Sequence, residues 1–270
     1  MLANKGCMLS ETPIKNGHIS YDTVEGLYAE WNGKKFSRVF EPEKALPPAA
    51  KTAYEDFRAH IAGEDFSCIG AKAALNGKIF RFGFYDEMNA LESNRILAKD
   101  LRAFSREQKN ADSNYASFAA IFAAPTFENE SMWETSLWKQ IENLHRLDAA
   151  SVWDSNVSSD PEDPNFSFSF AGTGFFIVGL HPSSSRLARR FSRAVMIFNP
   201  HAQFDRLREL EQYERLQKTI RAREMKLQGS LNPNLSDFGT QSEARQYSGR
   251  TVEESWKCPF HAAMNKPEKS

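Results

Sequence analysis

The sequence predicts an α/β (α+β) fold, with a central mixed β-sheet flanked by helices in a single domain with an N-terminal arm. Segments with helical spacing of apolar residues alternate with short strand-like segments along the chain. Some connections are too short for parallel crossovers, which predicts both parallel and antiparallel strand pairs. The 270 residues, 41% of them hydrophobic, suffice to bury one sizeable core. We therefore divide the chain into an arm (1–46), a main domain (47–262) and a tail (263–270).

Apolar spacing locates the elements of the first half. The arm is rich in aromatic residues and is expected to wrap the core. Pro47 and Pro48 suit the start of a helix, whose apolar residues recur at helical spacing until Gly63. Pro125 marks the end of the last strand of this half. The elements expected between these points are a strand at 78–84, a helix at 88–104 and a nearly all-apolar strand at 116–123.

The second half continues the alternation after a helix at about 132–148. A polar, proline-rich loop follows at 160–165. Gly172, Thr173 and Gly174 are expected to turn the chain between two strands. The elements predicted here are strands at 166–170 and 175–180, a short basic helix at 185–191, a strand at 194–198 and one long charged helix at 204–227.

Composition and missing motifs disfavour several classes of function. The net charge is −1, from 34 basic and 35 acidic residues, so the overall charge favours neither nucleic acid nor an anionic membrane as a partner. No apolar run approaches the length of a membrane span, and we expect a cytoplasmic protein. The absence of a Walker loop, G-x-G-x-x-G, G-x-S-x-G and H-E-x-x-H disfavours nucleotide hydrolysis, nicotinamide redox chemistry, esterases and common metalloproteases.

Cysteine usage indicates a reducing compartment and draws attention to one cysteine. Cys7, Cys68 and Cys258 are widely spaced and odd in number, which argues against a disulfide framework. Cys68 follows Phe66 in a turn-to-helix signal, where the first helical N–H groups and the helix dipole favour a thiolate. Gly70 and the alanines after it would let a flat cofactor approach the backbone. Such a thiolate is a nucleophile or a metal ligand, although a buried structural cysteine is the commoner outcome.

A histidine, serines and arginines gather after the strand predicted at 175–180. His181 stands at the strand end, and the serines that follow suit a helix N-cap. Arginines near a helix start can hold carboxylates or phosphates. A solvated helix face and a histidine bound to a loop are the alternatives. The candidate anion-binding residues are Ser184, Arg186, Arg189 and Arg190.

Three further candidates lie in the last third of the chain. His201 stands near a helix start, where capping or burial explains it as well as chemistry does. Asp237 and Glu243 belong to a polar stretch studded with aromatic residues, which we expect to pack as a lid or wall of a site. Their carboxylates could bind a polar substrate or form internal salt bridges. Cys258 and His261 are close enough to share a metal, but no matching pair elsewhere completes a zinc site.

These segments resemble the YqcI/YcgG family of bacterial and fungal proteins. The resemblance covers most of the chain from about Pro47 onward. It rests on the segments 66–74, 181–191, 198–201, 227–233, 242–250 and 256–260. Some members of this family are haem-dependent N-oxygenases that hydroxylate the guanidine nitrogen of arginine or related amines. The resemblance therefore implies that the domain at 47–262 binds haem b and uses O2 and an electron donor.

The function expected from this resemblance is N-oxygenation of a guanidine or amine group of an amino-acid-like small molecule. Cys68 is expected to bind the haem iron, with His181 as the rival ligand and His201 as a further one. Asp237 and Glu243 are expected to clamp the substrate cation. The other residues expected to hold the cofactor, or a carboxylate of the substrate, are Phe66, Gly70, Ser184, Arg186, Arg189 and Arg190.

Two other functions remain open from the sequence. A haem or small-ligand binding protein would use the same pocket without turnover. A cofactor-free enzyme would use Cys68 as a nucleophile and His181 or His201 as its base. The sequence leaves open the substrate, the electron donor and the oligomeric state, for which a homodimer is one option.

Overall fold

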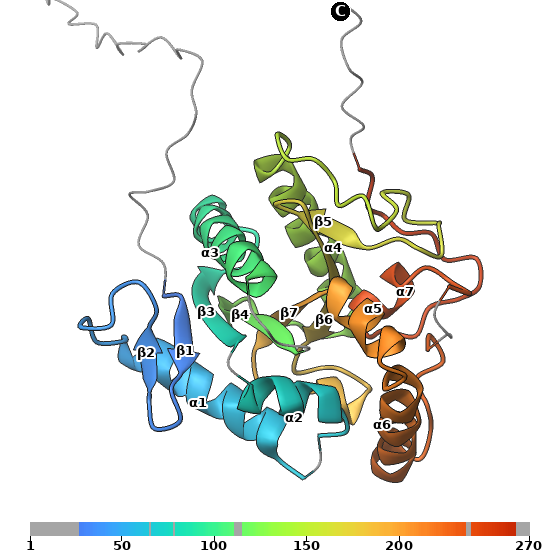
Figure 1. The fold of residues 1–270 in the computed structure, drawn as a ribbon, viewed down its shortest axis with the longest axis horizontal. Helices are drawn as coiled ribbons and strands as arrows, with labels where there is room; N and C mark the ends of the chain where they lie inside the picture. The colour runs from blue at the N-terminus through green and yellow to red at the C-terminus, as the bar shows by residue number, and fades with distance from the viewer. Residues whose placement is uncertain (1–26, 65, 78, 111–114, 236–238, 263–270) are drawn as a thin grey trace, which may run out of the picture.

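The computed structural model describes residues 27–64, 66–77, 79–110, 115–235 and 239–262. These residues form one seven-stranded sheet in the order β2-β1-β3-β4-β7-β6-β5, with helices on both faces (Figure 1). The pair β3–β4 is parallel and the other neighbouring pairs are antiparallel, so the predicted mixed sheet is confirmed. The strands are β1 Ala29–Trp31, β2 Phe36–Arg38, β3 Ile79–Glu87, β4 Ala116–Ala124, β5 Phe168–Phe170, β6 Thr173–Leu180 and β7 Ala194–Pro200.

Two separate cores lie on the two faces of the sheet. Helices α1 and α2 pack on one face, whereas α3, α4 and α7 pack on the other (Figure 1). Helices α5 and α6 continue the chain after β7. The helices are α1 Pro48–Ala62, α2 Ile69–Asn76, α3 Leu91–Lys109, α4 Glu130–Leu147, α5 Ala202–Glu209, α6 Tyr213–Gln228 and α7 Ala244–Tyr247.

Strand β4 explains why the segment predicted at 116–123 is almost entirely apolar. Phe118 and Phe122 belong to the core beneath α3 and α4, while Ala119 and Ile121 belong to the core beneath α1 and α2. A strand that is buried on both faces gains from apolar side chains at every position. The helix predicted from Pro48 is also confirmed, since α1 ends where Gly63 follows.

Part of the predicted N-terminal arm belongs to the sheet. Strands β1 and β2 form an antiparallel pair, and Ala29 pairs with Phe82 of β3. The arm therefore extends the sheet at the outer edge of β3. Residues 1–26 and the tail 263–270 lie outside the described residues. None of the helices in the described parts of the chain combines the length and the apolar character needed to cross a membrane.

Two predicted helices differ from the structure. The segment predicted as one helix at 204–227 is two helices, α5 and α6, because Glu211 adopts a left-handed backbone with φ of 56° between them. The helix predicted at 185–191 is only a 3-10 turn at Leu187–Arg189. Its backbone is bonded to the end of β6 instead, since His181 N donates to Arg189 O and Phe191 N donates to His181 O.

Candidate functional site

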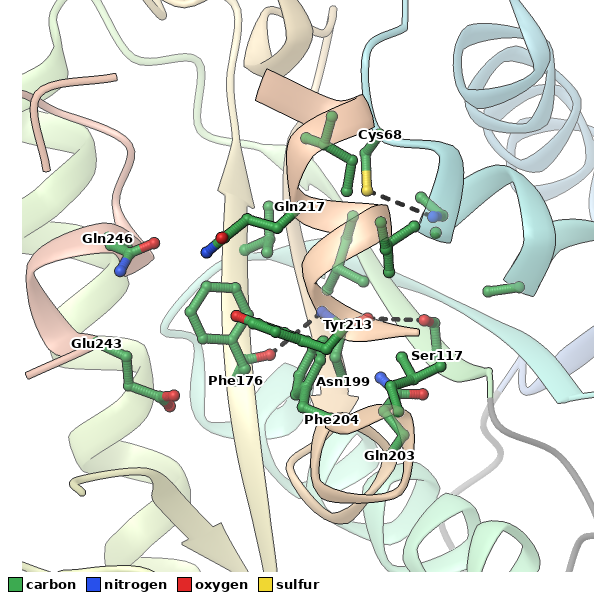
Figure 2. A pocket seen from close by; sticks show the side chains of 18 of the residues that line it. Cys68, Ser117, Phe176, Asn199, Gln203, Phe204, Tyr213, Gln217, Glu243 and Gln246 are labelled. Atoms are coloured by element: carbon green, nitrogen blue, oxygen red, sulfur yellow. Dashed lines mark hydrogen bonds between the residues drawn. The ribbon is translucent and has the colours of Figure 1, made fainter. Parts of the chain in front are cut away.

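A largely apolar cavity of about 290 Å³ lies on the α1–α2 side of the sheet. Its walls come from α1 and α2, from β3, β4, β6 and β7, and from α5 and α6 (Figure 2). Further lining residues lie closer to the C-terminus: Leu235, Gly239, Gln241, Glu243 and Gln246. The volume approaches the lower end of the range for small-molecule sites, about 300–1,000 Å³. Five predicted site residues, far apart in the sequence, line this one cavity: Phe66, Cys68, Gly70, His201 and Glu243.

Cys68 lines the cavity from the N-terminus of α2. Its Sγ accepts a hydrogen bond from Ala71 N at 3.4 Å, so the cysteine is the N-cap of the helix. The loop before it is attached to α6, because the Arg223 guanidinium donates to Phe66 O at 3.1 Å and to Ser67 O at 3.2 Å. These contacts fix the direction of the thiol relative to the cavity wall.

Burial raises the pKa of the Cys68 thiol, although the Ala71 and Gly70 N–H groups act in the opposite direction. The expectation that the helix N-terminus would yield a thiolate is therefore wrong for the protein without a bound metal. Loss of hydration destabilises the thiolate by more free energy than the nearby N–H groups contribute to stabilising it. Because only the thiolate is a good nucleophile, this burial also disfavours the cofactor-free thiol enzyme.

Glu243 lines the cavity as the residue just before α7. In Figure 2 it lies at the opposite end of the displayed side chains from Cys68. Its Oε1 accepts hydrogen bonds from Ser167 Oγ and from Tyr247 Oη, the latter at 2.6 Å. Burial raises the pKa of this carboxyl to about 8, although both hydroxyl donors lower it. The network orients Glu243 while leaving Oε2 for another partner.

His201 lies between two carboxyl groups. Its Nδ1 is 3.5 Å from Asp205 Oδ2, and its Nε2 is 3.9 Å from Glu243 Oε2. Burial lowers the pKa of the imidazole, while the nearby Asp205 raises it. Both ring nitrogens thus lie near carboxyl oxygens, one on α5 itself and one just before α7. This orientation of His201 suits a proton carrier. We therefore take Cys68, and not His201, as the candidate iron ligand.

His181 does not line the cavity. Its side chain is fully buried and stacked on Trp133, on the side of the sheet that α4 covers. Burial lowers the pKa of His181 to about 4, so the ring is neutral at physiological pH. The prediction of His181 as a catalytic residue or rival ligand is therefore not supported by its position.

The four predicted anion-binding residues also lie outside the cavity, because they bind other parts of the chain. The Arg186 guanidinium forms an ion pair with Glu224 of α6 and donates to Ser230 O at 2.6 Å. Arg189 donates to the carbonyls of Gln246 at 2.8 Å and Tyr247 at 3.1 Å. Ser184 and Arg190 bind each other, since Arg190 Nε donates to Ser184 O at 2.9 Å. These contacts hold the cavity walls together.

One predicted site residue cannot be placed, and several lining residues were missed. Asp237 lies outside the described residues.

The lining residues that the sequence analysis missed are mainly aromatic and amide side chains, and α6 supplies a whole face of the cavity wall. The lining residues of α6 recur at i, i+3, i+4 and i+7, and this spacing is the signal that could have revealed the face. None of the α6 residues is buried, so the face is not part of a core. The missed lining residues include Phe176, Phe204, Tyr213, Leu216, Gln217 and Ile220.

No group of three or more His, Cys, Asp or Glu side chains in the described ranges could hold a metal ion. Cys258 belongs to the core on the α3–α4 side and does not line the cavity. Haem iron, by contrast, can be held by a single axial side chain of the protein. Cys68 supplies such a donor beside apolar walls, and the cationic side chains of Arg208 and Arg221 also line the cavity. The residues present therefore fit a haem group in their donor chemistry.

Comparison with known proteins identifies related chains. A model of the YqcI/YcgG family matches residues 57–261. The uncharacterized protein YcgG of Bacillus subtilis (strain 168) is 28% identical over 255 residues, which cover 90% of this chain and 97% of that protein. No solved structure matches the chain.

Proposed function

The chain belongs to the YqcI/YcgG family, and from this premise we propose that it is a haem-dependent N-oxygenase for a guanidine or amine group of an amino-acid-like small molecule. The observation that carries the proposal is the shared cavity of Cys68 and Glu243. One wall offers a soft thiol donor for iron, and another offers an oriented carboxyl for a cation. Dioxygen and an electron donor complete the proposed reaction.

The proposed haem ligand is the Cys68 thiolate. Binding of iron would displace the thiol proton that burial otherwise retains. Phe66 and Gly70 lie beside it on the cavity wall, and Arg221, which lines the same cavity, would pair with a propionate. When bound, haem supplies the activation of O2 that no amino-acid side chain provides. The thiol must stay reduced for this role, as it does in the cytoplasm.

The substrate cation is proposed to bind at Glu243. Ser167 and Tyr247 bond to Oε1 of this carboxyl, and Oε2, 3.9 Å from His201 Nε2, is the oxygen proposed to accept from the cation. A charge-assisted hydrogen bond from a guanidinium or ammonium group would be strong in these apolar surroundings. Gln217 of α6 and Gln246 of α7 line the same cavity and offer neutral hydrogen-bonding groups for the rest of the substrate.

The absorption spectrum of the purified, haem-supplied protein tests the proposal. We expect a Soret band that shifts to the red position of a thiolate-ligated carbonyl complex after dithionite and carbon monoxide. Cys68→Ala should lose this signature, whereas Cys258→Ala, in the other core, should keep it. An unaltered spectrum of Cys68→Ala would overturn thiolate ligation.

A turnover screen then tests the enzyme activity. The haem-loaded protein is supplied with an electron donor and screened with amines and guanidines, and mass spectrometry should detect a product that contains one more oxygen. A haem spectrum without any such product would favour the binding protein over the enzyme.

A further inference from the structure

Three titratable side chains connect the cavity to the surface of α5. Asp205 of α5 is 44% exposed at its side chain, whereas His201 and Glu243 are 9% and 14% exposed. The distances between neighbours in this row are 3.5 Å from Asp205 Oδ2 to His201 Nδ1 and 3.9 Å from His201 Nε2 to Glu243 Oε2. The row thus runs from solvent to the cavity carboxyl through a single imidazole.

We propose that Glu243 accepts a proton from the bound substrate and that His201, held by Asp205, carries this proton to solvent. The proposal rests on the proposed function, because a guanidinium or ammonium nitrogen has no free electron pair for bonding to oxygen. The substrate N–H bond breaks and its electron pair stays on nitrogen, while the proton forms an O–H bond on Glu243 Oε2. The proton then moves to His201 Nε2, and the Nδ1 proton leaves toward Asp205 and water. No oxidant or reductant enters this step.

The elements around the row fix its direction. Oε1 of Glu243 is occupied by two hydroxyl donors, from Ser167 and Tyr247, so only Oε2 faces the imidazole. The backbone N–H of His201 donates to Gly174 O of β6 at 2.8 Å, which anchors the histidine at the end of β7. Asp205, one turn later, also forms an ion pair with Arg208, so its carboxylate stays on the His201 side of α5.

The surroundings of the row set the protonation of its two buried groups. Burial raises the pKa of Glu243 to about 8, with Tyr247 and Arg208 as its titratable neighbours. This carboxyl is therefore protonated near neutral pH until a bound cation favours its ionised form, and the ionised form is the one that accepts the proton. Burial and Arg208 lower the pKa of His201, whereas Asp205 and, to a smaller extent, Asp154 raise it. An imidazole with a lowered pKa releases the proton quickly instead of retaining it.

Calorimetry tests, without any dependence on turnover, whether Glu243 ionises when the cation binds, which the acceptor role requires. At pH 7, methylguanidinium is titrated into the full-length, haem-supplied protein in two buffers of different ionisation enthalpy. Glu243 should be mostly protonated before binding, so the wild type should release about one proton per bound cation. Glu243→Gln should release none, and Glu209→Gln, an exposed carboxyl on α5, should match the wild type. Binding without proton release from the wild type, or failure to bind, would overturn the acceptor role.

Turnover of the loaded protein tests the exit route. His201→Ala should slow turnover on the order of 100-fold, as for loss of a general acid–base group. Added 2-methylimidazole, whose methyl group hinders binding to iron, should restore much of this loss, and it should not rescue Glu243→Gln. Asp205→Asn should shift the pH profile of the rate. An unchanged rate of His201→Ala, or no rescue, would overturn the relay.

The haem spectrum separates this proposal from the proposed function. All three variants should keep the spectrum of the wild type, because none replaces Cys68. A protein that never binds haem would refute the proposed function, while the calorimetric result would still decide whether Glu243 is the acceptor.

Discussion

The imidazole of His181 is stacked on the indole of Trp133, with ring centroids 5.2 Å apart and an interplanar angle of 22°. Trp133 Nε1 donates to Ser248 O at 2.9 Å, so the indole joins α4 to the segment after α7. Neither ring nitrogen of His181 has a hydrogen-bond partner among the described residues. His181 therefore serves as a neutral aromatic plate in the core.

This stacking predicts that His181→Phe preserves both the fold and the haem spectrum. Phenylalanine keeps the aromatic contact and removes two buried nitrogens that lack hydrogen-bond partners within the described part of the chain. The free energy gained by removing them offsets the strain of a slightly larger ring. We expect the free energy of unfolding to change by less than about 1 kcal/mol. Urea denaturation of both proteins checks this, together with their absorption spectra. Loss of the Soret band in the variant would restore His181 as the iron ligand.

Alkylation by iodoacetamide should be slow at Cys68 in the haem-free protein at neutral pH. Burial raises the pKa of this thiol, so the rate should increase only above the ordinary range for cysteine, about 8.5. Burial also raises the pKa of Cys258, to about 12, and that thiol should react more slowly still. Peptide mass spectrometry after timed alkylation at several pH values measures each cysteine separately. Rapid modification of Cys68 at pH 6 would instead support the thiol-nucleophile hypothesis.

Arg186 should contribute to stability, not to anion binding. The side chains of Arg186 and Glu224 are 8% and 13% exposed, so removal of one partner leaves a buried charge. We expect Arg186→Met to lower the free energy of unfolding by about 3 to 5 kcal/mol and to accelerate hydrogen exchange in α6. Lys226→Met, an exposed position on the same helix, is the control and should stay close to the wild type. Equal stability of the two variants would contradict this role.

Two glycine-to-alanine changes should differ sharply. A Cβ at Gly179 would lie 2.6 Å from the Trp133 ring and 2.9 Å from Tyr247 O, so Gly179→Ala must displace packed groups. We expect a cost of about 1 to 3 kcal/mol or more in the free energy of unfolding. At Gly70 the nearest atom, Leu216 Cδ2, would be 3.7 Å away, and Gly70→Ala should fold normally. Thermal unfolding compares the pair, and similar melting temperatures would contradict the difference in packing.

Asp100 should make stability depend on pH. Burial raises its pKa from the ordinary 3.8 to about 7, although the Tyr85 hydroxyl donates to it at 2.8 Å. The folded chain therefore binds one more proton than the unfolded chain between these values. The stability from this group is present below about pH 4 and is lost as pH rises through 7.

The matched variant for this effect is Asp100→Asn, which keeps the shape of the side chain but cannot ionise. Between pH 5 and pH 8, the stability of the wild type relative to the variant should fall by on the order of 3 kcal/mol. Urea unfolding of both proteins at the two pH values measures the difference. A constant difference would show that Asp100 titrates alike in the folded and unfolded chains.

Local patterns were sufficient for much of the fold. Strand β4 is apolar at successive positions because both of its faces are buried, and its extent was predicted within a residue or two. The prolines and Gly63 likewise delimited α1. The sequence also indicated Cys68 and Glu243 as candidates, from the chemistry of their side chains alone. These features depend on residues close together in the sequence, so apolar periodicity and capping residues are enough to predict them.

The sequence by itself determined the alternation of helices and strands, the family resemblance and the residues that can carry chemistry. Only the tertiary structure decided which of them share a cavity. It placed His181 outside the cavity that Cys68 lines and paired Arg186 with Glu224 in an ion pair. It also brought His201 Nε2 within 3.9 Å of Glu243 Oε2. The physical reason is that burial and charge pairing depend on segments far apart in the sequence. Burial decided even the protonation of Cys68, where desolvation outweighs the N–H groups of its own helix.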